Sequence, residues 1–301
     1  MKGLLSPSVE VARALAVRGP LVALETTLVT HGLPHPAGLE LAAGMEAAVR
    51  EAGAVPASIG VLDGRVRVGL SPAELARLAT SADVAKLNPG NLAAVAAAGG
   101  PGSTTVAATL LVAHRVGIGV LATGGIGGVH RGAAESGDVS ADLAALSRFP
   151  LAVVCAGAKA VLDLPRTLEA LESLGVPVYG LGWDRFPAFY RRDSGLGLDG
   201  AFDRIENVAA AVRAHLELGA GTAALVTVPV PVEHELPLEL YQGALERALA
   251  EAAAARVRGR AVTPFLLERM RLLTGEASVA TNRALLLHNA GVAGALAVAL
   301  V

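Results

Sequence analysis

A lysine closes a run of small apolar residues, where its amine is placed to act as a nucleophile. The run is Val153-Val154-Cys155-Ala156-Gly157-Ala158-Lys159. Burial among apolar neighbours disfavours the charged ammonium, and the free amine then attacks a carbonyl carbon to form an imine. A lysine that merely ends a strand in solvent is the alternative, and the spacing alone leaves both open.

A carboxylate in an earlier segment has the surroundings of a proton-transfer group. Glu25 ends the apolar run Pro20–Glu25, and two threonines and then His31 follow it. Hydroxyls and a histidine beside a carboxylate at a strand end suit general acid–base chemistry. Glu25 could equally cap the next segment or pair with an arginine, since structural ion pairs place carboxylates in similar positions.

A glycine-rich segment, Gly124–Gly128, has four glycines in five residues and directly follows an apolar run. Such a segment predicts a loop whose backbone a ligand approaches closely. Its spacing fits neither the dinucleotide-binding fingerprint nor the P-loop. His130 and Arg131 come next and are placed to meet an anion.

Polar residues continue beyond the glycine-rich segment, at Asp138, Ser140 and Asp142. Ser140 is suited to cap a helix, and Asp142 would then interact favourably with the dipole of that helix. A purely structural role therefore explains Asp142 more readily than Asp138, which precedes the cap.

Two further places are candidates for holding an anion. Gly102–Thr105 offers hydroxyls and backbone amides at the mouth of a predicted helix, although a plain helix cap explains it equally well. Lys86 follows a short apolar stretch and suits phosphate binding, with an exposed lysine as the alternative.

Short apolar runs bounded by glycine, proline or charged residues predict strands that are mostly buried on both faces. They are Pro20–Glu25, Ile59–Asp63, Val66–Leu70, Ile118–Thr123, Leu151–Ala156, Val176–Leu181 and Ala223–Val228. Helical segments alternate with these runs, at Pro72–Thr80, Pro165–Leu174, Leu238–Arg256 and Phe265–Thr274. Ser71 and Thr263 each precede a proline and are predicted helix caps. The alternation predicts a three-layer α/β fold, and one domain over residues 1–301 is the simplest interpretation.

The composition excludes several classes of protein. The chain has 301 residues, 53% of them hydrophobic, which is ample for a large core. Its net charge is −2 without a cluster of Lys or Arg, so we expect no polymeric nucleic acid as a partner. The single cysteine, Cys155, is expected to be buried and fits a reducing cytoplasm. We expect no signal peptide and no membrane span; the apolar segment Ala284–Val301 contains His288 and Asn289 and predicts a buried or interfacial helix.

Taken together, these segments resemble the pseudouridine-5′-phosphate glycosidase family, also called indigoidine synthase A-like. The resemblance runs from about Leu21 to Ala290. Besides the Glu25 segment, the motifs that carry it are Gly124-Gly125-Ile126-Gly127-Gly128-Val129-His130-Arg131-Gly132, Asp138-Val139-Ser140-Ala141-Asp142-Leu143, Val153–Lys159, and Thr263-Pro264-Phe265-Leu266-Leu267.

The resemblance implies a three-layer α/β/α fold with a mixed, mostly parallel sheet, a homotrimer, and one divalent metal per subunit, typically Mn²⁺. It implies that Lys159 is the nucleophile, Glu25 the proton donor and Asp138 the metal ligand. The residues that it places against the substrate are Lys86, Val106, Ser140, Ala141, Asp142 and Asn282.

The implied reaction is reversible cleavage of the carbon–carbon glycosidic bond of pseudouridine 5′-phosphate, to uracil and ribose 5-phosphate, through a ring-opened lysine imine. Two alternatives are a Schiff-base lyase or aldolase that acts on another sugar phosphate, and a non-catalytic accessory protein of a pigment pathway. Fold alone does not decide among them.

Overall fold

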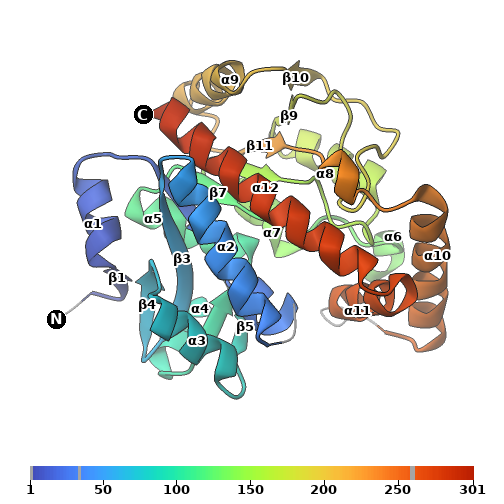
Figure 1. Cartoon of the computed structure of the whole chain (residues 1–301), viewed down its shortest axis with the longest axis horizontal. Helices are drawn as coiled ribbons and strands as arrows, with labels where there is room; N and C mark the ends of the chain where they lie inside the picture. Colours follow the sequence, from blue (N-terminus) through green and yellow to red (C-terminus); the bar gives the residue numbers. More distant parts are fainter. Residues whose placement is uncertain (1–2, 33–34, 258–261) are drawn as a thin grey trace.

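An eleven-stranded mixed sheet forms the centre of the computed structural model, which describes residues 3–32, 35–257 and 262–301 (Figure 1). Leu33 and Pro34, which end the Glu25 segment, lie outside the described part, as does the side chain of Thr263. The prediction that Thr263 caps a helix is wrong, because the helix Val262–Thr274 already includes it. The strands are β1 (Leu5–Pro7), β2 (Leu21–Leu24), β3 (Val55–Leu62), β4 (Arg65–Val68), β5 (Ala85–Leu87), β6 (Gly102–Thr104), β7 (Val120–Ala122), β8 (Ala152–Cys155), β9 (Val178–Leu181), β10 (Gly200–Phe202) and β11 (Ala224–Thr227).

The strand order along the sheet is β1-β4-β3-β2-β7-β8-β11-β9-β10, with β6 paired to β3 and β5 to β6. Strand β3 runs antiparallel to β4 and β6, whereas the pairings from β3 through β2 to β10 are parallel. The mixed, mostly parallel sheet implied by the family resemblance is therefore confirmed.

Helices cover both faces of this sheet. They are α1 (Val9–Ala16), α2 (Ala37–Glu51), α3 (Pro72–Thr80), α4 (Leu92–Ala97), α5 (Val106–Val116), α6 (Ala133–Ser136), α7 (Ala141–Leu146), α8 (Leu164–Ser173), α9 (Ile205–Glu217), α10 (Leu238–Ala254), α11 (Val262–Thr274) and α12 (Ala277–Leu300), with a π-helical turn η1 (Leu28–Gly32) and a 3-10 turn η2 (Val232–His234). Figure 1 shows α2, α9 and α12 on the near face and α5 and α7 behind the sheet, which is the three-layer α/β/α arrangement.

All seven predicted strands are present, and their ends differ from the prediction by a few residues. Every residue of β2, β8 and β11 is buried, as continuous apolar runs predict for strands covered on both faces. Cys155 is buried in β8, as expected. Four strands of three residues each were not predicted, because none of them lies in a longer apolar run like the one that contains β7; they are β1, β5, β6 and β10.

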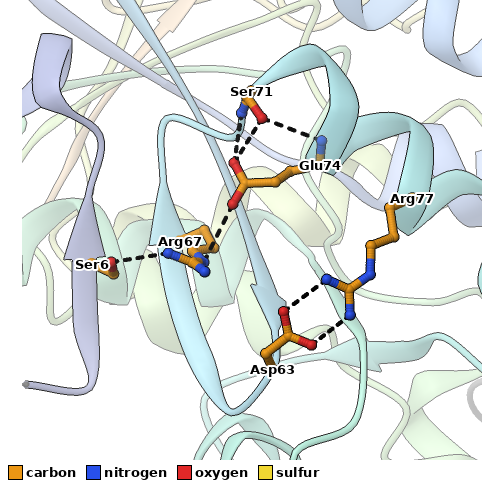
Figure 2. Close-up of polar contacts among 6 residues, drawn as sticks. All are labelled: Ser6, Asp63, Arg67, Ser71, Glu74 and Arg77. Atoms are coloured by element: carbon orange, nitrogen blue, oxygen red, sulfur yellow. Dashed lines mark hydrogen bonds and ion pairs between the residues drawn. The ribbon is translucent and has the colours of Figure 1, made fainter.

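Local capping fixes where helix α3 begins. The Ser71 hydroxyl accepts from the Glu74 amide, and the Glu74 carboxylate accepts from the Ser71 amide, forming a capping box ahead of Pro72. Figure 2 shows the same carboxylate paired with Arg67 of β4, which ties the helix start to the strand next to edge strand β1. The predicted start and end of this helix are confirmed.

Helix α12 is the one helix among residues 3–32, 35–257 and 262–301 with the length and apolar composition to cross a membrane. It instead runs along α2 and over β7 and β8, and many of its residues are buried there (Figure 1). The structure therefore agrees with the interpretation of this segment as a buried helix. The helix starts at Ala277, earlier than predicted, and includes both Asn282 and Asn289.

Strands β2, β7 and β8 are adjacent and parallel, and their ends are level. Leu24 pairs with Ala122, and Ala122 pairs with Val154. The residues that follow these strands, from Glu25, Thr123 and Ala156 onward, therefore emerge at the same carboxyl edge of the sheet. This edge is where open α/β sheets bind their ligands.

Candidate active site

A cavity of about 110 Å³ lies at this carboxyl edge, and four of the predicted site residues line it. Glu25 and Lys159 come from the ends of β2 and β8, Lys86 from β5, and Asn282 from α12. The other lining residues are Thr27, Leu28, His31, Gly32, Thr123, Gly124, Gly125, Phe189, Pro264, Leu267 and Leu286. Segments more than 250 positions apart in the sequence thus meet around one space.

The Glu25 carboxylate is held by a hydroxyl on each oxygen. Thr123 donates to Oε1 at 2.5 Å, and Thr27 donates to Oε2. Glu25 is only 9% exposed, and no described arginine pairs with it. The alternatives of a helix cap or an arginine pair are therefore wrong, and the carboxylate faces the cavity with a fixed orientation.

Lys159 reaches the cavity through a tight turn after β8. Gly157 has φ +78°, and a Cβ there would lie 2.1 Å from the carbonyl oxygen of Pro187, so only glycine fits. The amide of Lys159 donates to the carbonyl of Ile126 at 3.0 Å, which ties the turn to the glycine-rich segment. The side chain is half-buried, and no carboxylate among the described residues forms an ion pair with it. Its amine is therefore available to attack a ligand.

Lysine is rare in this chain, which has 22 arginines and only three lysines. Two of the three, Lys86 and Lys159, line the same cavity, and the third, Lys2, lies outside the described residues. Unlike arginine, lysine can lose its proton inside a protein and act as a nucleophile. The choice of lysine at these two positions therefore favours amine chemistry in the cavity.

Lys86 and Lys159 influence each other electrostatically. Partial burial of the Lys86 ammonium and repulsion from Lys159 both lower the pKa of Lys86, whereas Glu25 and Asp142 oppose this shift. The Lys86 side chain as a whole remains exposed, so its lowered pKa reflects the surroundings of the ammonium group at its end. Two amines near one carboxylate give the cavity an excess of positive charge, which suits an anionic substrate.

His31 lies on the same side of the cavity as Lys86. Its Nδ1 is 2.6 Å from the Thr30 hydroxyl, which donates to Ser103 at 2.7 Å. Desolvation and the charge of Lys86 lower the pKa of His31, while a hydrogen bond to Val84 opposes the shift. His31 is therefore mainly neutral near pH 7 and is a second group that could exchange a proton with a ligand.

The glycine-rich segment divides into two parts with different roles. Gly124 and Gly125 line the cavity, as predicted for a segment that a ligand approaches. Gly127 instead meets the Ser140 side chain, because a Cβ there would lie 2.2 Å from Oγ of Ser140. Its amide donates to Asp142 at 2.7 Å. This half of the segment serves close packing rather than ligand binding.

Asp142 joins two elements through its buried carboxylate. One oxygen accepts from the Ala107 amide of α5 at 2.9 Å, and the other accepts from the Gly127 amide. Asp142 lies in the first turn of α7, as expected for an acid that interacts with the dipole of that helix, and its oxygens in addition bind backbone amides of other segments. Ser140 caps α7 as expected, with the Asp142 amide donating to its hydroxyl at 3.2 Å.

Ser140, Ala141, Asp142 and Val106 do not line the cavity described above. Val106 is the buried first residue of α5, next to the amide that Asp142 binds. Ser140 and Asp142 contact Gly127 of the glycine-rich segment instead. Their predicted contacts with substrate stay predictions.

The hydroxyls of Thr104 and Thr105 are not free to bind an anion. Thr104 donates to the carbonyl of Ile59 at 2.7 Å, and Thr105 donates to that of Leu87 at 2.8 Å. Thr105 also caps α5, and the preceding residues form strand β6 rather than a loop. The plain-cap interpretation of this segment is therefore the correct one.

Asp138 lies beside His130 and is not among the residues that line the cavity. The His130 amide donates to the Asp138 carbonyl at 3.1 Å, and burial lowers the pKa of His130 while Asp138 opposes and Lys159 reinforces the shift. Within the described residues no three His, Cys, Asp or Glu side chains gather closely enough to hold a metal ion. Divalent cations of the Mg²⁺ type often keep several waters and only one or two carboxylates, and Mn²⁺ shares their preference for oxygen. One carboxylate is compatible with such a site, and Asp138 as a metal ligand stays a prediction.

Three residues around the site were not recognised as functional from the sequence. Thr123 holds Glu25, and the buried Asn289 donates to the Thr123 carbonyl at 2.8 Å. Phe189 lines the cavity with φ +62°, a conformation that bulky residues seldom adopt and that is often found at functional sites. Of the three, only Asn289 could have been noticed in the sequence. It is an asparagine inside an apolar helix, and a buried side-chain amide needs hydrogen-bond partners.

Comparison with known proteins identifies the family. Residues 10–299 match the family described as indigoidine synthase A like protein. Proteins named pseudouridine-5′-phosphate glycosidase are similar over nearly the whole chain. The one from Rhodospirillum centenum is 55% identical, covering 99% of this chain and 93% of that protein; the one from Paracoccus denitrificans is 51% identical, covering 100% and 99%.

Two solved structures have the same fold. The prealnumycin C-glycosynthase AlnA, determined in complex with ribulose 5-phosphate, is 37% identical with a TM-score of 0.92, covering 100% of this chain and 98% of that one. An indigoidine synthase A-like protein from Thermotoga maritima is 34% identical with a TM-score of 0.88, covering 98% and 96%. The resemblance seen in the motifs is confirmed at the level of whole sequences and structures, and the chain belongs to the indigoidine synthase A-like family.

Proposed function

We propose that this protein is a pseudouridine-5′-phosphate glycosidase, which reversibly cleaves the substrate to uracil and ribose 5-phosphate. The observation that carries the proposal is the convergence of Glu25 and the unpaired amine of Lys159 on one cavity. Relatives of that name, which are 51% and 55% identical to this chain over nearly its full length, support the same activity.

The bond to be broken explains why an amine is needed. Ordinary glycosidases use two carboxylates and expel an oxygen-linked leaving group. In pseudouridine the sugar carbon C1′ is bonded to carbon 5 of uracil, which is a poor leaving group. The ribose ring opens as the ring oxygen leaves C1′ and takes a proton, and the Lys159 amine adds to C1′. The nitrogen lone pair then forms the imine while the C1′–C5 bond breaks and C5 takes a proton.

Water completes the cycle by hydrolysing the imine, which frees Lys159 and ribose 5-phosphate. Glu25 is the group positioned to move these protons, because it shares the cavity with Lys159 and its carboxylate is fixed by Thr27 and Thr123. Lys86 supplies a second cation, which suits the phosphate.

The family resemblance also implies Mn²⁺ at Asp138, a homotrimer and, with the single cysteine, a cytoplasmic location. We propose the metal and the trimer on that basis. A divalent ion bound at Asp138 would supply positive charge and ordered water beside His130. The homotrimer is tested by the mass of the protein in solution.

The direct test is an assay of uracil release. Purified protein is incubated with pseudouridine 5′-phosphate and a divalent metal, and the products are separated and quantified. We expect uracil and ribose 5-phosphate in equal amounts. No turnover in either direction would contradict the proposal. An aldolase or lyase that acts on another sugar phosphate, the second candidate suggested by the ribulose 5-phosphate complex of a relative, would trap that sugar but release no uracil.

The phosphate is expected to matter for binding. Lys86→Ala should raise the KM for pseudouridine 5′-phosphate by about 10- to 100-fold, because a hydrogen bond to a charged group contributes about 1.5–3 kcal/mol. The variant should change the weak activity on free pseudouridine little. Lys86→Arg, which keeps the charge, is the matched control. If the wild-type enzyme used nucleoside and nucleotide equally well, the phosphate assignment would be wrong.

Removal of the metal is expected to stop turnover without unfolding the chain. Treatment with a chelator, or Asp138→Asn, should lower uracil release by at least about 100-fold, the upper range for losing support of a metal site. Circular dichroism should remain unchanged, and added Mn²⁺ should restore the chelated wild type but not the variant. Asp203→Asn, at an exposed aspartate away from the cavity, is the control. Full activity after thorough chelation would rule the metal out.

A further inference from the structure

The support behind Glu25 extends out of the cavity into helix α12. We propose that Asn289 is a positioning residue for the Glu25 carboxyl, an inference that rests on the function proposed above. Asn289 has no exposed surface. Its side-chain amide donates to the main-chain carbonyl of Thr123 at 2.8 Å, and a longer contact of 3.4 Å reaches the carbonyl of Gly124.

The Thr123 carbonyl needs this donor because strand β7 ends one residue earlier, at Ala122. The Thr123 amide still pairs with the Val154 carbonyl of β8 at 3.0 Å. Among the described residues, no main-chain amide bonds to the Thr123 carbonyl. A buried carbonyl without a partner is costly, so Asn289 holds Thr123 in place where the sheet no longer does.

Thr123 in turn contacts the Glu25 carboxylate directly. The Thr123 hydroxyl donates to Oε1 of Glu25 at 2.5 Å, opposite the Thr27 hydroxyl on the other oxygen. A hydroxyl can donate to a carboxylate and accept from a carboxyl, so this contact persists in both protonation states of Glu25. Asn289 thereby fixes the orientation of the proton-transfer group without touching the substrate.

The unused end of the amide favours this role over general structural support. Oδ1 of Asn289 is buried and has no hydrogen-bond partner among the described residues. Only the donor end is used, and it points at the residue that holds Glu25. A leucine would fill the same space without a donor, and an aspartate would set its oxygens against the two carbonyls.

The experiment compares Asn289→Leu, Thr123→Val and the double variant in two assays, uracil release and borohydride trapping of ribose 5-phosphate on Lys159. We expect kcat to fall about 10-fold for Asn289→Leu and about 100-fold for Thr123→Val, as small misplacements of a catalytic group can cost that much. KM should change less than about twofold and trapping should remain near wild type. Because the residues act through one contact, the double variant should be no worse than Thr123→Val.

Three variants make the test decisive. Thr227→Val removes a similar buried bond, to the Tyr179 carbonyl, at the end of β11 and should leave kcat unchanged. Thr123→Ser keeps the hydroxyl and should recover most of kcat. Asn289→Ser loses reach with less change in packing, so it decides if Asn289→Leu does not fold. Unchanged kcat in folded Asn289 variants, equal losses of release and trapping, or losses that multiply in the double variant would each overturn the proposal. A wild-type enzyme that released no uracil would instead refute the proposed function.

Discussion

Lys159→Ala is expected to abolish uracil release, with a loss of at least about 1,000-fold, as found when a covalent nucleophile is removed. The physical reason is that carbon 5 of uracil leaves only when C1′ can form a double bond to nitrogen. Lys159 is the amine that follows the buried strand β8 through the turn at Gly157 and lines the same cavity as Glu25. Among the described residues that line the cavity, only Lys86 offers a second side-chain amine that could form the imine in its place.

Trapping identifies the reactive amine directly. Borohydride added with ribose 5-phosphate should reduce the imine to a stable secondary amine, whose mass and position are read by peptide mass spectrometry. The low lysine content simplifies the assignment of the modified residue, since Lys2, Lys86 and Lys159 are the only side-chain amines that can carry the adduct, besides the N-terminal amine. Lys86→Ala should still form the adduct, and Lys159→Ala should not. An adduct found only on Lys86 would exchange the roles of the two lysines.

The fold was largely predictable because most of its strands lie in apolar runs that can be recognised in the sequence. The segments that became β2, β7 and β8 could be recognised individually, and their parallel pairing follows from the alternation of strands and helices. Strands β5 and β6 could not be recognised, since neither lies in a longer apolar run like the one that contains β7, and each depends on pairing with its neighbours. Tertiary contacts rather than local sequence form them.

The site residues likewise divide into those that local sequence predicts and those that it does not. Glu25 and Lys159 stood out from local sequence because each ends an apolar run, and parallel strands bring such ends to one edge. Lys86 was a weaker candidate, because an exposed lysine explained its position equally well, and Asn282 was located only through the family resemblance. The pairing of Asn289 with Thr123 joins residues 166 positions apart and follows from how α12 crosses β7, which no local pattern encodes.

Asp142 is a residue whose hydrogen-bond partners could not be predicted from the sequence. Its position after a helix cap predicted an interaction with the dipole of α7. In the structure its carboxylate links the start of α5 to Gly127, because the glycine-rich segment passes close enough to donate an amide. A local rule explained why an acid is tolerated there, but the partner that it binds depends on the packing of three segments.

Glu25→Gln is expected to lower uracil release by about 10²–10⁴-fold, the usual contribution of a positioned proton-transfer group. The amide keeps the size of the carboxyl and can still contact the hydroxyls of Thr27 and Thr123, so the cavity should keep its shape. What it loses is the proton that carbon 5 of uracil must gain as the C1′–C5 bond breaks. Glu25→Ala should show a similar loss.

The two assays separate this role from general damage to the site. Imine formation between Lys159 and ribose 5-phosphate can exchange protons with water, so Glu25→Gln should still give the borohydride adduct. Glu46→Gln is the matched control, because Glu46 is also a partly buried carboxyl bonded by a hydroxyl, that of Ser58, and lies outside the cavity. It should leave turnover unchanged. Near-normal turnover in Glu25→Gln would move the proton-transfer role to another group, with His31 the first to examine because it lines the same cavity.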